Sequence, residues 1–208
     1  MSQDIRENLR ISYDQHVHER EGRRPWRKQV QERETFLENM RSAGLSSLLD
    51  VGAATGIDGS FFASYEIAVT CIDLSAENVQ AAREKGLKAE QMDVTQLNFE
   101  DGSFGAVWSW NCLLHLPKVE WAQALAEIHR VLKPGGLFFL GVFGGNEFEG
   151  VWENDDYHPK RFYTFMPDNE LIKLVEGHFE LVDFHTHRTS ASAPAAHFQA
   201  LTCKRKLK

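Results

Sequence analysis

The sequence has little cysteine, no excess of positive charge and no long hydrophobic run. Its three cysteines (Cys71, Cys112 and Cys203) lie far apart without a C-x-x-C pair, so we expect neither a disulfide framework nor a zinc knuckle. Lys and Arg number 23 against 30 Asp and Glu, a net charge of −7, whereas proteins that hold nucleic acid are usually basic. No apolar run approaches the roughly 18 residues of a membrane span, and residues 1–6 do not resemble a signal peptide. We therefore expect a cytoplasmic protein with no nucleic-acid and no membrane partner.

The 208 residues suit a single domain (1–208) with three parts. Residues 1–45 have apolar positions at helical spacing, interrupted near Pro25, which predicts two helices that form an N-terminal cap. Residues 46–143 alternate short apolar runs with amphipathic stretches, the pattern of βαβ units and a parallel sheet. Residues 144–208 comprise a long loop, a helix and a terminal hairpin. Strands are expected at 47–51, 67–72, 87–92, 104–108, 137–143, 179–187 and 197–203, and the last two should pair antiparallel through a loop at 189–196.

A glycine-rich segment follows the first strand and reads Asp50-Val-Gly52-Ala-Ala-Thr-Gly56-Ile-Asp58-Gly59. Such a strand-to-helix turn exposes backbone N–H groups and lets a ligand approach the chain. It suits either a dinucleotide or S-adenosylmethionine, and an ordinary turn without ligand is the alternative. Asp50 and Asp58 would repel a pyrophosphate but attract an ammonium and a sulfonium. The charge pattern therefore favours S-adenosylmethionine over NAD(P).

Two more acidic residues follow the next two strands. Asp73 ends the second strand, where a carboxylate can accept hydrogen bonds from ribose hydroxyls, and Ser75 beside it can cap the next helix. Asp93 follows the third strand, where it could accept from an adenine amine while Met92 and Val94 cover the ring. Acids at three successive strand ends on one sheet edge indicate a nucleoside cofactor.

From Leu48 onward, the motifs of the chain and their order resemble those of the class I S-adenosylmethionine-dependent methyltransferases. The glycine segment resembles their first motif, Cys71–Ser75 the second, Glu90–Asp93 the third, Phe104–Trp108 the fourth-strand motif, and Ile128–Gly136 the turn before the fifth strand. Ala54 in the first motif and Gly105 in the fourth-strand motif depart from the family pattern. The resemblance implies an α/β fold: a doubly wound, three-layer, Rossmann-like sheet of seven strands, mostly parallel, with a C-terminal antiparallel hairpin, plus the N-terminal helices. It also implies the cofactor S-adenosyl-L-methionine, held by Asp50, Gly52, Ala53, Ala54, Thr55, Gly56, Asp58, Asp73, Leu74, Ser75, Met92, Asp93, Val94, Asn111 and Cys112.

Histidines are the remaining candidates for chemistry. His115 follows the fourth strand, near the expected reaction centre, and is a candidate catalytic residue, with a helix-packing role as the alternative. The pairs His16-x-His18 and His185-x-His187 have no cluster of acidic or cysteine residues beside them in sequence, so no metal site is expected. Cys112 has no local base and is not expected to act as a nucleophile.

The acceptor site should come from additions to the core, namely the N-terminal helices and the loop after the fifth strand. Its candidate residues are Tyr13, Trp26, Arg33, Trp110, Trp152 and Tyr157. The acids between residues 147 and 156 suggest a polar, cationic or amine-bearing acceptor. We thus predict an enzyme that transfers a methyl group to a small molecule by in-line displacement, as a monomer or homodimer. The alternatives are a non-catalytic S-adenosylmethionine-binding module and an NAD(P)-dependent oxidoreductase.

Overall fold

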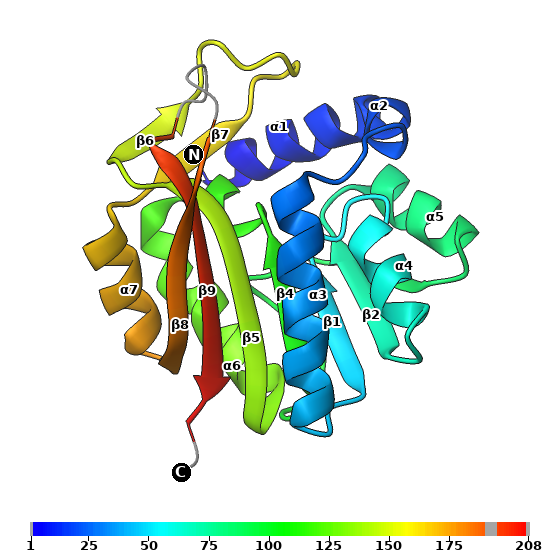
Figure 1. Cartoon of the computed structure of the whole chain (residues 1–208). Helices are drawn as coiled ribbons and strands as arrows, with labels where there is room; N and C mark the ends of the chain where they lie inside the picture. The colour runs from blue at the N-terminus through cyan, green and yellow to red at the C-terminus, as the bar shows by residue number, and fades with distance from the viewer. Residues whose placement is uncertain (1, 190–194, 207–208) are drawn as a thin grey trace.

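The fold is built on a seven-stranded sheet with the order β3-β2-β1-β4-β5-β9-β8 (Figure 1). The computed structural model describes residues 2–189 and 195–206, so positions 190–194 of the predicted hairpin loop lie outside the described residues. Strands β1 to β5 run parallel, and β9 pairs antiparallel with both β5 and β8, as expected. The strands are β1 (Ser47–Val51), β2 (Ala68–Asp73), β3 (Lys88–Gln91), β4 (Phe104–Trp110), β5 (Leu132–Gly144), β8 (Phe179–Arg188) and β9 (His197–Arg205).

Helices cover both faces of the sheet and one of its ends (Figure 1). The helices α3 (Arg27–Ser42), α4 (Ile57–Ala63) and α5 (Ala76–Glu84) pack on one face, and α6 (Trp121–Val131) and α7 (Asp168–Glu176) on the other. The helices α1 (Ser2–Gln15) and α2 (Val17–Glu21) lie across the carboxyl ends of the parallel strands. Two short 3-10 helices, η1 (Leu113–His115) and η2 (Lys118–Glu120), connect β4 to α6.

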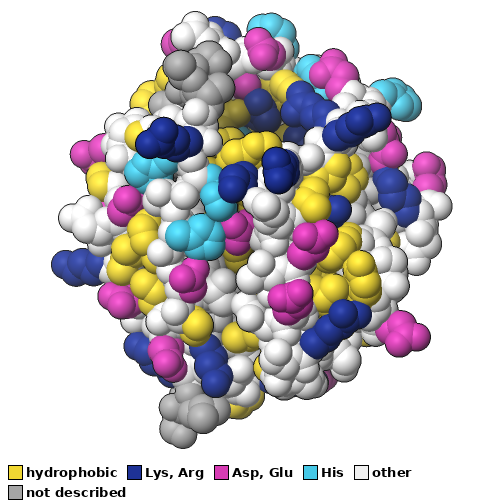
Figure 2. Space-filling model, in the orientation of Figure 1, with side chains coloured by type: hydrophobic (Ala, Val, Ile, Leu, Met, Phe, Trp, Pro, Cys, Tyr) yellow, Lys and Arg dark blue, Asp and Glu magenta, His cyan; other side chains and the backbone are white. Residues whose placement is uncertain are grey.

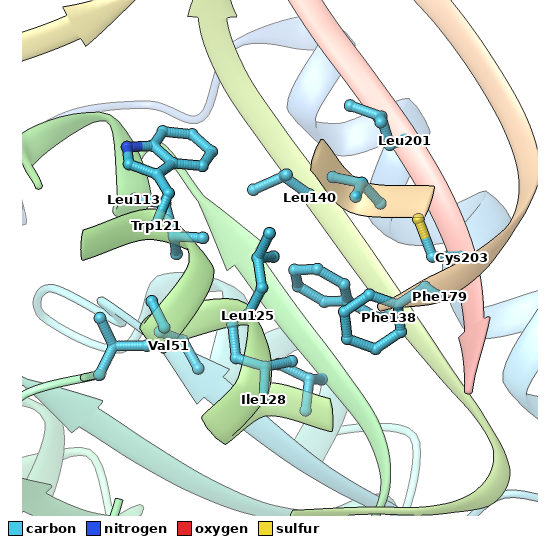
Figure 3. Packing of buried hydrophobic residues seen from close by; sticks show 14 of the residues in the cluster. Val51, Leu113, Trp121, Leu125, Ile128, Phe138, Leu140, Phe179, Leu201 and Cys203 are labelled. Carbon is cyan, nitrogen blue, oxygen red and sulfur yellow. The ribbon is translucent and has the colours of Figure 1, made fainter. Parts of the chain in front are cut away.

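The core has one apolar layer on each side of the sheet. Behind it, Trp121, Leu125 and Ile128 of α6 recur at helical spacing and pack on Phe138 and Leu140 of β5 (Figure 3). In front, α3 contributes the buried Phe36, Leu37 and Met40, which pack against Trp108 and Phe139. Each fully buried side chain of this size stabilises the fold by about 1.5–3 kcal/mol, so these layers hold the strand ends in a fixed arrangement.

The structure differs from the sequence prediction in two places. The cap contains three helices instead of two, because the chain breaks at His16 between α1 and α2 as well as before α3. The segment 144–167 was expected to be one long loop, and that prediction was wrong. It contains a two-stranded antiparallel sheet, β6 (Phe148–Val151) and β7 (Phe162–Phe165), whose facing Phe148 and Phe165 rings are 5.6 Å apart. Among the described helices, none is long and apolar enough to cross a membrane.

Candidate functional site

The loop after β1 has a backbone that turns repeatedly through the left-handed region. Gly52, Ala54 and Gly56 have φ angles of 71°, 49° and 79°. Ala54 carries a side chain in this conformation, which costs free energy unless neighbouring groups hold it there. The Ala54 N–H donates to Asp73 Oδ2 at 2.8 Å, and Gly52 N–H donates to the Ile72 carbonyl at 2.9 Å. The end of β2 therefore fixes the shape of the glycine loop.

Two adjoining cavities open at the carboxyl ends of the strands. The larger has a volume of about 390 Å³ and lies between the glycine loop, the cap and the β6–β7 sheet; dark-blue cationic side chains gather beside the hollow at the top of the molecule in Figure 2. The smaller, of about 50 Å³, lies under α1 at the ends of β1, β2 and β3. Gly52 and His115 line both cavities. The two spaces therefore meet beside the loop and η1.

The two carboxylates nearest the glycine loop differ in their partners. Asp50 is 2% exposed, and its Oδ2 is a buried acceptor with no hydrogen-bond partner among the described residues. Burial and the charges of Asp58 and Asp73 raise the pKa of Asp50 well above its usual value. Asp58 instead accepts hydrogen bonds from Gln29 (2.7 Å), Arg33 (3.0 Å) and the Trp108 indole (3.1 Å). Its charge is therefore offset by Arg33, and it would repel a pyrophosphate less than the sequence argument assumes.

The acids that follow β2 and β3 are held by different donors. Asp73 accepts from the Ala54 and Ser75 backbone and from Asn78, while burial raises its pKa. Burial would also raise the pKa of Asp93, but hydrogen bonds from Arg6 and Thr95 outweigh burial and lower it. The Arg6 guanidinium, from α1, contacts Asp93 and also donates to Glu120 at 2.8 Å. In this conformation α1 therefore covers the smaller cavity through an ion pair to Asp93.

His115 lies at the junction of the two cavities and is 5% exposed. Its Nδ1 is 2.8 Å from the Phe162 carbonyl oxygen, which can only accept, so Nδ1 carries the proton. Its Nε2 must then accept from the Tyr13 hydroxyl, 2.7 Å away. Burial and the nearby Arg161 lower the pKa of His115 to about 3. His115 is therefore a neutral group that orients Tyr13 in the wall of the larger cavity.

Comparison with known proteins identifies the core. Residues 48–136 match the family described as "Methyltransferase domain". Residues 48–136 of the chain are a methyltransferase domain. It is 33% identical over 105 residues to 27-O-demethylrifamycin SV methyltransferase of Amycolatopsis mediterranei, an alignment that covers 46% of this chain and 38% of that protein. It is 28% identical over 170 residues to the chloroplastic tocopherol O-methyltransferase of Arabidopsis thaliana, covering 68% of this chain and 48% of that protein. The chain thus spans less than half the length of these two curated relatives.

A solved structure has the same fold over the whole chain. It is the Burkholderia thailandensis 1,6-didemethyltoxoflavin-N1-methyltransferase with bound 1,6-didemethyltoxoflavin and S-adenosylhomocysteine. The two chains superpose with a TM-score of 0.74 at 22% identity, covering 100% of this chain and 91% of the other. The predicted seven-stranded, Rossmann-like class is confirmed as the fold of this methyltransferase domain.

Most residues predicted to hold the cofactor of the methyltransferase domain line one cavity or the other. The smaller cavity is lined by Asp73, Leu74, Met92, Asp93, Val94 and Cys112, and the larger by Asp50, Ala53, Ala54, Thr55, Asp58 and Asn111. Gly56 and Ser75 lie outside both linings: Gly56 is the N-cap residue that precedes α4, and the Ser75 hydroxyl caps α5 by accepting from Asn78 N–H at 3.1 Å. Burial raises the pKa of the Cys112 thiol, which disfavours its thiolate form.

The predicted acceptor-site residues divide into two groups. Tyr13 and Trp110 line the larger cavity, whereas Trp26, Arg33, Trp152 and Tyr157 do not. Arg33 is held by Asp58 and lies over the Phe61 ring, and Trp152 packs on Phe148 in the small sheet. Tyr157 is buried against His16, and Trp26 packs on Trp110 from outside. Of these four side chains, Tyr157 and Trp26 touch residues close to the cavity, and Arg33 and Trp152 stabilise the walls.

The sequence argument missed several residues of the larger cavity. These are Arg20, Arg23, Arg24, Tyr163 and Phe165, whereas Arg161 belongs to the segment after the fifth strand that was expected to contribute to the acceptor site. Three of them belong to the charged segment that ends the first part of the cap, which the sequence argument used only as a helix break. A run of three arginines within five residues is the signal that could have identified them.

Proposed function

We propose that the chain is an S-adenosylmethionine-dependent methyltransferase that acts on a small molecule. The observation that carries the proposal is the pair of cavities that meet at Gly52 and His115, beside a glycine loop of the methyltransferase domain. The residues that line the smaller cavity suit the nucleoside, although a space of about 50 Å³ must widen to admit it. The larger cavity suits the methionine part of the cofactor together with the acceptor. S-adenosylmethionine supplies a methyl group that its sulfonium charge already activates.

The residues present fit this cofactor. Asp50 Oδ2 and Asn111 Oδ1 are buried acceptors without a partner in the described chain, and both residues line the larger cavity. An unpaired buried acceptor costs about 1–3 kcal/mol, so a bound ammonium group would remove this cost and lower the pKa of Asp50. In the smaller cavity, Leu74, Met92 and Val94 offer apolar contacts to a base. The Arg6–Asp93 ion pair must open or share Asp93 when the base enters.

The chain's own contribution to the reaction is alignment and exclusion of water. The cap roofs the larger cavity with Tyr13 and Arg20, and Trp110 and Phe165 supply apolar walls. Orientation of two reactants in such a site accounts for much of the acceleration of a displacement reaction. His115 has a pKa of about 3, so it is a poor proton acceptor at neutral pH and serves to orient Tyr13. The acceptor should therefore need no strong base from the protein.

The charges around the larger cavity support an acceptor that is planar and anionic, such as an aromatic carboxylate or an acidic phenol. Arg20, Arg23 and Arg24 line it, and among the described residues no acidic side chain forms an ion pair with them. Three of the acids that suggested a cationic acceptor have other partners: Asp155 pairs with Arg161 at 2.5 Å, Glu147 with Lys118 at 3.7 Å, and Glu149 accepts from the Lys118 backbone N–H at 2.9 Å. One arginine suffices for the cofactor carboxylate, which leaves further cationic groups for the acceptor.

The test has a binding part and a turnover part. Calorimetry should show that S-adenosylmethionine and S-adenosylhomocysteine bind and that NADH does not; tight NADH binding without a response to S-adenosylhomocysteine would favour the oxidoreductase. Transfer of labelled methyl groups should occur with a panel of aromatic carboxylates and phenols, and less with their neutral or amine analogues. Arg24→Gln should raise KM for the anionic acceptor about tenfold, the loss of a charge-assisted contact, whereas Arg41→Gln on the outside of α3 should not. Cofactor binding without turnover on any acceptor would favour the non-catalytic module.

The cellular setting that we propose is the cytoplasm, with a small-molecule acceptor and neither nucleic acid nor membrane as partner. The net charge of −7 supports the absence of a nucleic-acid partner, and the free Cys71, Cys112 and Cys203 support a reducing compartment. We propose a single domain that works as a monomer or homodimer, and light scattering of the purified chain tests this.

A further inference from the structure

A cluster of two histidines and one carboxylate joins α3 to the edge strand β8. His185 and His187 are two residues apart in β8, so their side chains lie on the same face of the strand. Glu32 reaches them from α3, more than 150 positions earlier in the sequence. Glu32 could not be identified from the sequence around the histidine pair, because it belongs to another element.

The ligand atoms of the cluster converge on one point. Glu32 Oε1 is 2.8 Å from His185 Nε2 and 2.5 Å from His187 Nε2, and the three ligand atoms all lie within 4.8 Å of one another. A zinc ion takes histidine nitrogens at about 2.0–2.1 Å and carboxylate oxygens at about 2.0–2.2 Å, which places tetrahedral ligand atoms a little over 3 Å apart. Small side-chain rotations therefore suffice to close the three groups around an ion.

The surroundings of the cluster are those of a metal centre. The other ring nitrogen of His185, Nδ1, lies 2.6 Å from Asp183 Oδ2, and such a second carboxylate commonly orients a metal-binding histidine. The side chains of Glu32 and His187 are 8% and 12% exposed, with Trp26 and Phe198 against the His187 ring. His185 is 42% exposed and provides a path from solvent. Figure 2 shows histidine side chains beside acidic ones on this face.

Glu32 forms ion pairs only with histidines among the described residues. Within the described part of the chain, its ion-pair partners are the two histidines, and no Lys or Arg pairs with it. A carboxylate this buried is costly unless it is paired or binds a cation. None of the three residues lines either of the two cavities, so the cluster is separate from the proposed methyl-transfer site.

We propose that Glu32, His185 and His187 bind one divalent transition-metal ion, with zinc as the best fit, and so clamp α3 to β8. Two imidazoles and one carboxylate favour zinc, nickel or copper over magnesium or calcium, which prefer oxygen ligands. Three protein ligands leave a fourth position, and the exposed side of His185 is where water would fill it. The clamp holds the edge of the sheet against the helix that precedes β1.

The experiment titrates chelator-treated full-length protein with Zn²⁺ in competition with a chromophoric chelator, and uses Co²⁺ as a spectroscopic probe. We expect one equivalent of metal, visible Co²⁺ bands typical of a four-coordinate site, and a higher melting temperature with Zn²⁺ than with Mg²⁺. His185→Asn, at the most exposed ligand, should weaken Zn²⁺ binding at least 100-fold and remove the Co²⁺ bands. Asp183→Asn should weaken binding by about 10–100-fold, the usual cost of losing an outer carboxylate.

The control is His178→Asn, a histidine that follows α7 and lies outside the cluster. It should bind Zn²⁺ as tightly as the unmodified chain. Circular dichroism without metal checks that each variant folds. The proposal is wrong if the unmodified chain takes up no stoichiometric metal, or if His185→Asn binds Zn²⁺ with unchanged affinity. Either result would leave the cluster as a set of hydrogen bonds.

Discussion

Replacement of Asp73 by alanine should destabilise the glycine loop even when no ligand is bound. The Asp73 carboxylate accepts three hydrogen bonds inside the protein, from Ala54 N at 2.8 Å, Ser75 N at 2.9 Å and Asn78 Nδ2 at 3.2 Å. Two of these donors are backbone groups, and Ala54 is held with φ at 49°. The carboxylate thus joins the end of β2 to both the glycine loop and the start of α5.

The size of the stability loss follows from the hydrogen-bond donors that the substitution leaves without an acceptor. A buried donor without a partner costs about 1–3 kcal/mol, so two backbone N–H groups left without an acceptor cost about 2–6 kcal/mol. Removal of a buried carboxylate recovers part of this, since burial of Asp73 already raises its pKa. We expect Asp73→Ala to lower the free energy of unfolding by about 2–4 kcal/mol. Asp73→Asn keeps the size and one carbonyl acceptor, and its loss should be about half as large.

Urea unfolding of the ligand-free chain, followed by the fluorescence of its five tryptophans, measures this loss. Calorimetry with S-adenosylhomocysteine on the same variants then separates loop stability from ligand contact. If Asp73→Ala binds the ligand poorly yet unfolds within about 1 kcal/mol of the unmodified chain, Asp73 acts on the ligand alone. That result would refute the loop-anchoring argument and restore the simpler ribose-acceptor role.

Three further predictions concern the same region. Burial raises the pKa of Asp50, so the folded chain holds this proton more tightly than the unfolded chain, and the stability of the fold falls as the pH rises above the usual Asp pKa. Asp50→Asn should remove this pH dependence and stabilise the chain by about 1–3 kcal/mol at pH 7.5, which urea unfolding at pH 5 and pH 7.5 measures. The pKa of His115 is lowered to about 3, so the unfolded chain binds this proton more tightly and the stability of the fold falls as the pH drops below about 6.5. The melting temperature of His115→Gln should therefore fall less between pH 6.5 and pH 5 than that of the unmodified chain. Gly52→Ala places a Cβ 2.5 Å from the Cys112 Cβ at a φ of 71° and should cost about 2–4 kcal/mol in urea unfolding, whereas Gly44→Ala, at a similar φ but with no neighbour within 4 Å, should cost about 1 kcal/mol.

The sheet and the glycine loop were predictable because their signals are local. Strands β1, β2 and β4 are short apolar runs, and each is followed within a few residues by a turn residue or an acid. The carboxyl ends of parallel strands meet at one edge, so Asp50, Asp73 and Asp93 had to lie near one another. The antiparallel end of the sheet was equally readable from two strand patterns separated by a short loop.

The acceptor-site residues were harder to predict because their positions depend on contacts between distant elements. Arg33 is of a residue type common in binding sites, but Asp58 lies 3.0 Å away and holds it against α4. Trp152 has the look of an aromatic lid, but strand pairing between Phe148 and Phe165 buries one side of it. In each case the contacting residue lies outside the local sequence pattern. The sequence therefore shows the type of residue but does not reveal what its side chain contacts.

The three acids at the strand ends show what that difference does to function. The three acids occupy equivalent positions in the sequence pattern, but their partners in the structure differ. Asp93 pairs with Arg6 from α1, Asp73 accepts hydrogen bonds from backbone donors, and Asp50 keeps one oxygen without a hydrogen-bond partner among the described residues. The element that covers each strand end decides its chemistry. Because only Asp50 retains an unpaired oxygen, it is the carboxylate best placed to receive a cationic ammonium group, whereas a ligand that reaches Asp93 must first compete with Arg6. We therefore expect ligand entry to depend on the position of α1, the helix that also brings Tyr13 to His115.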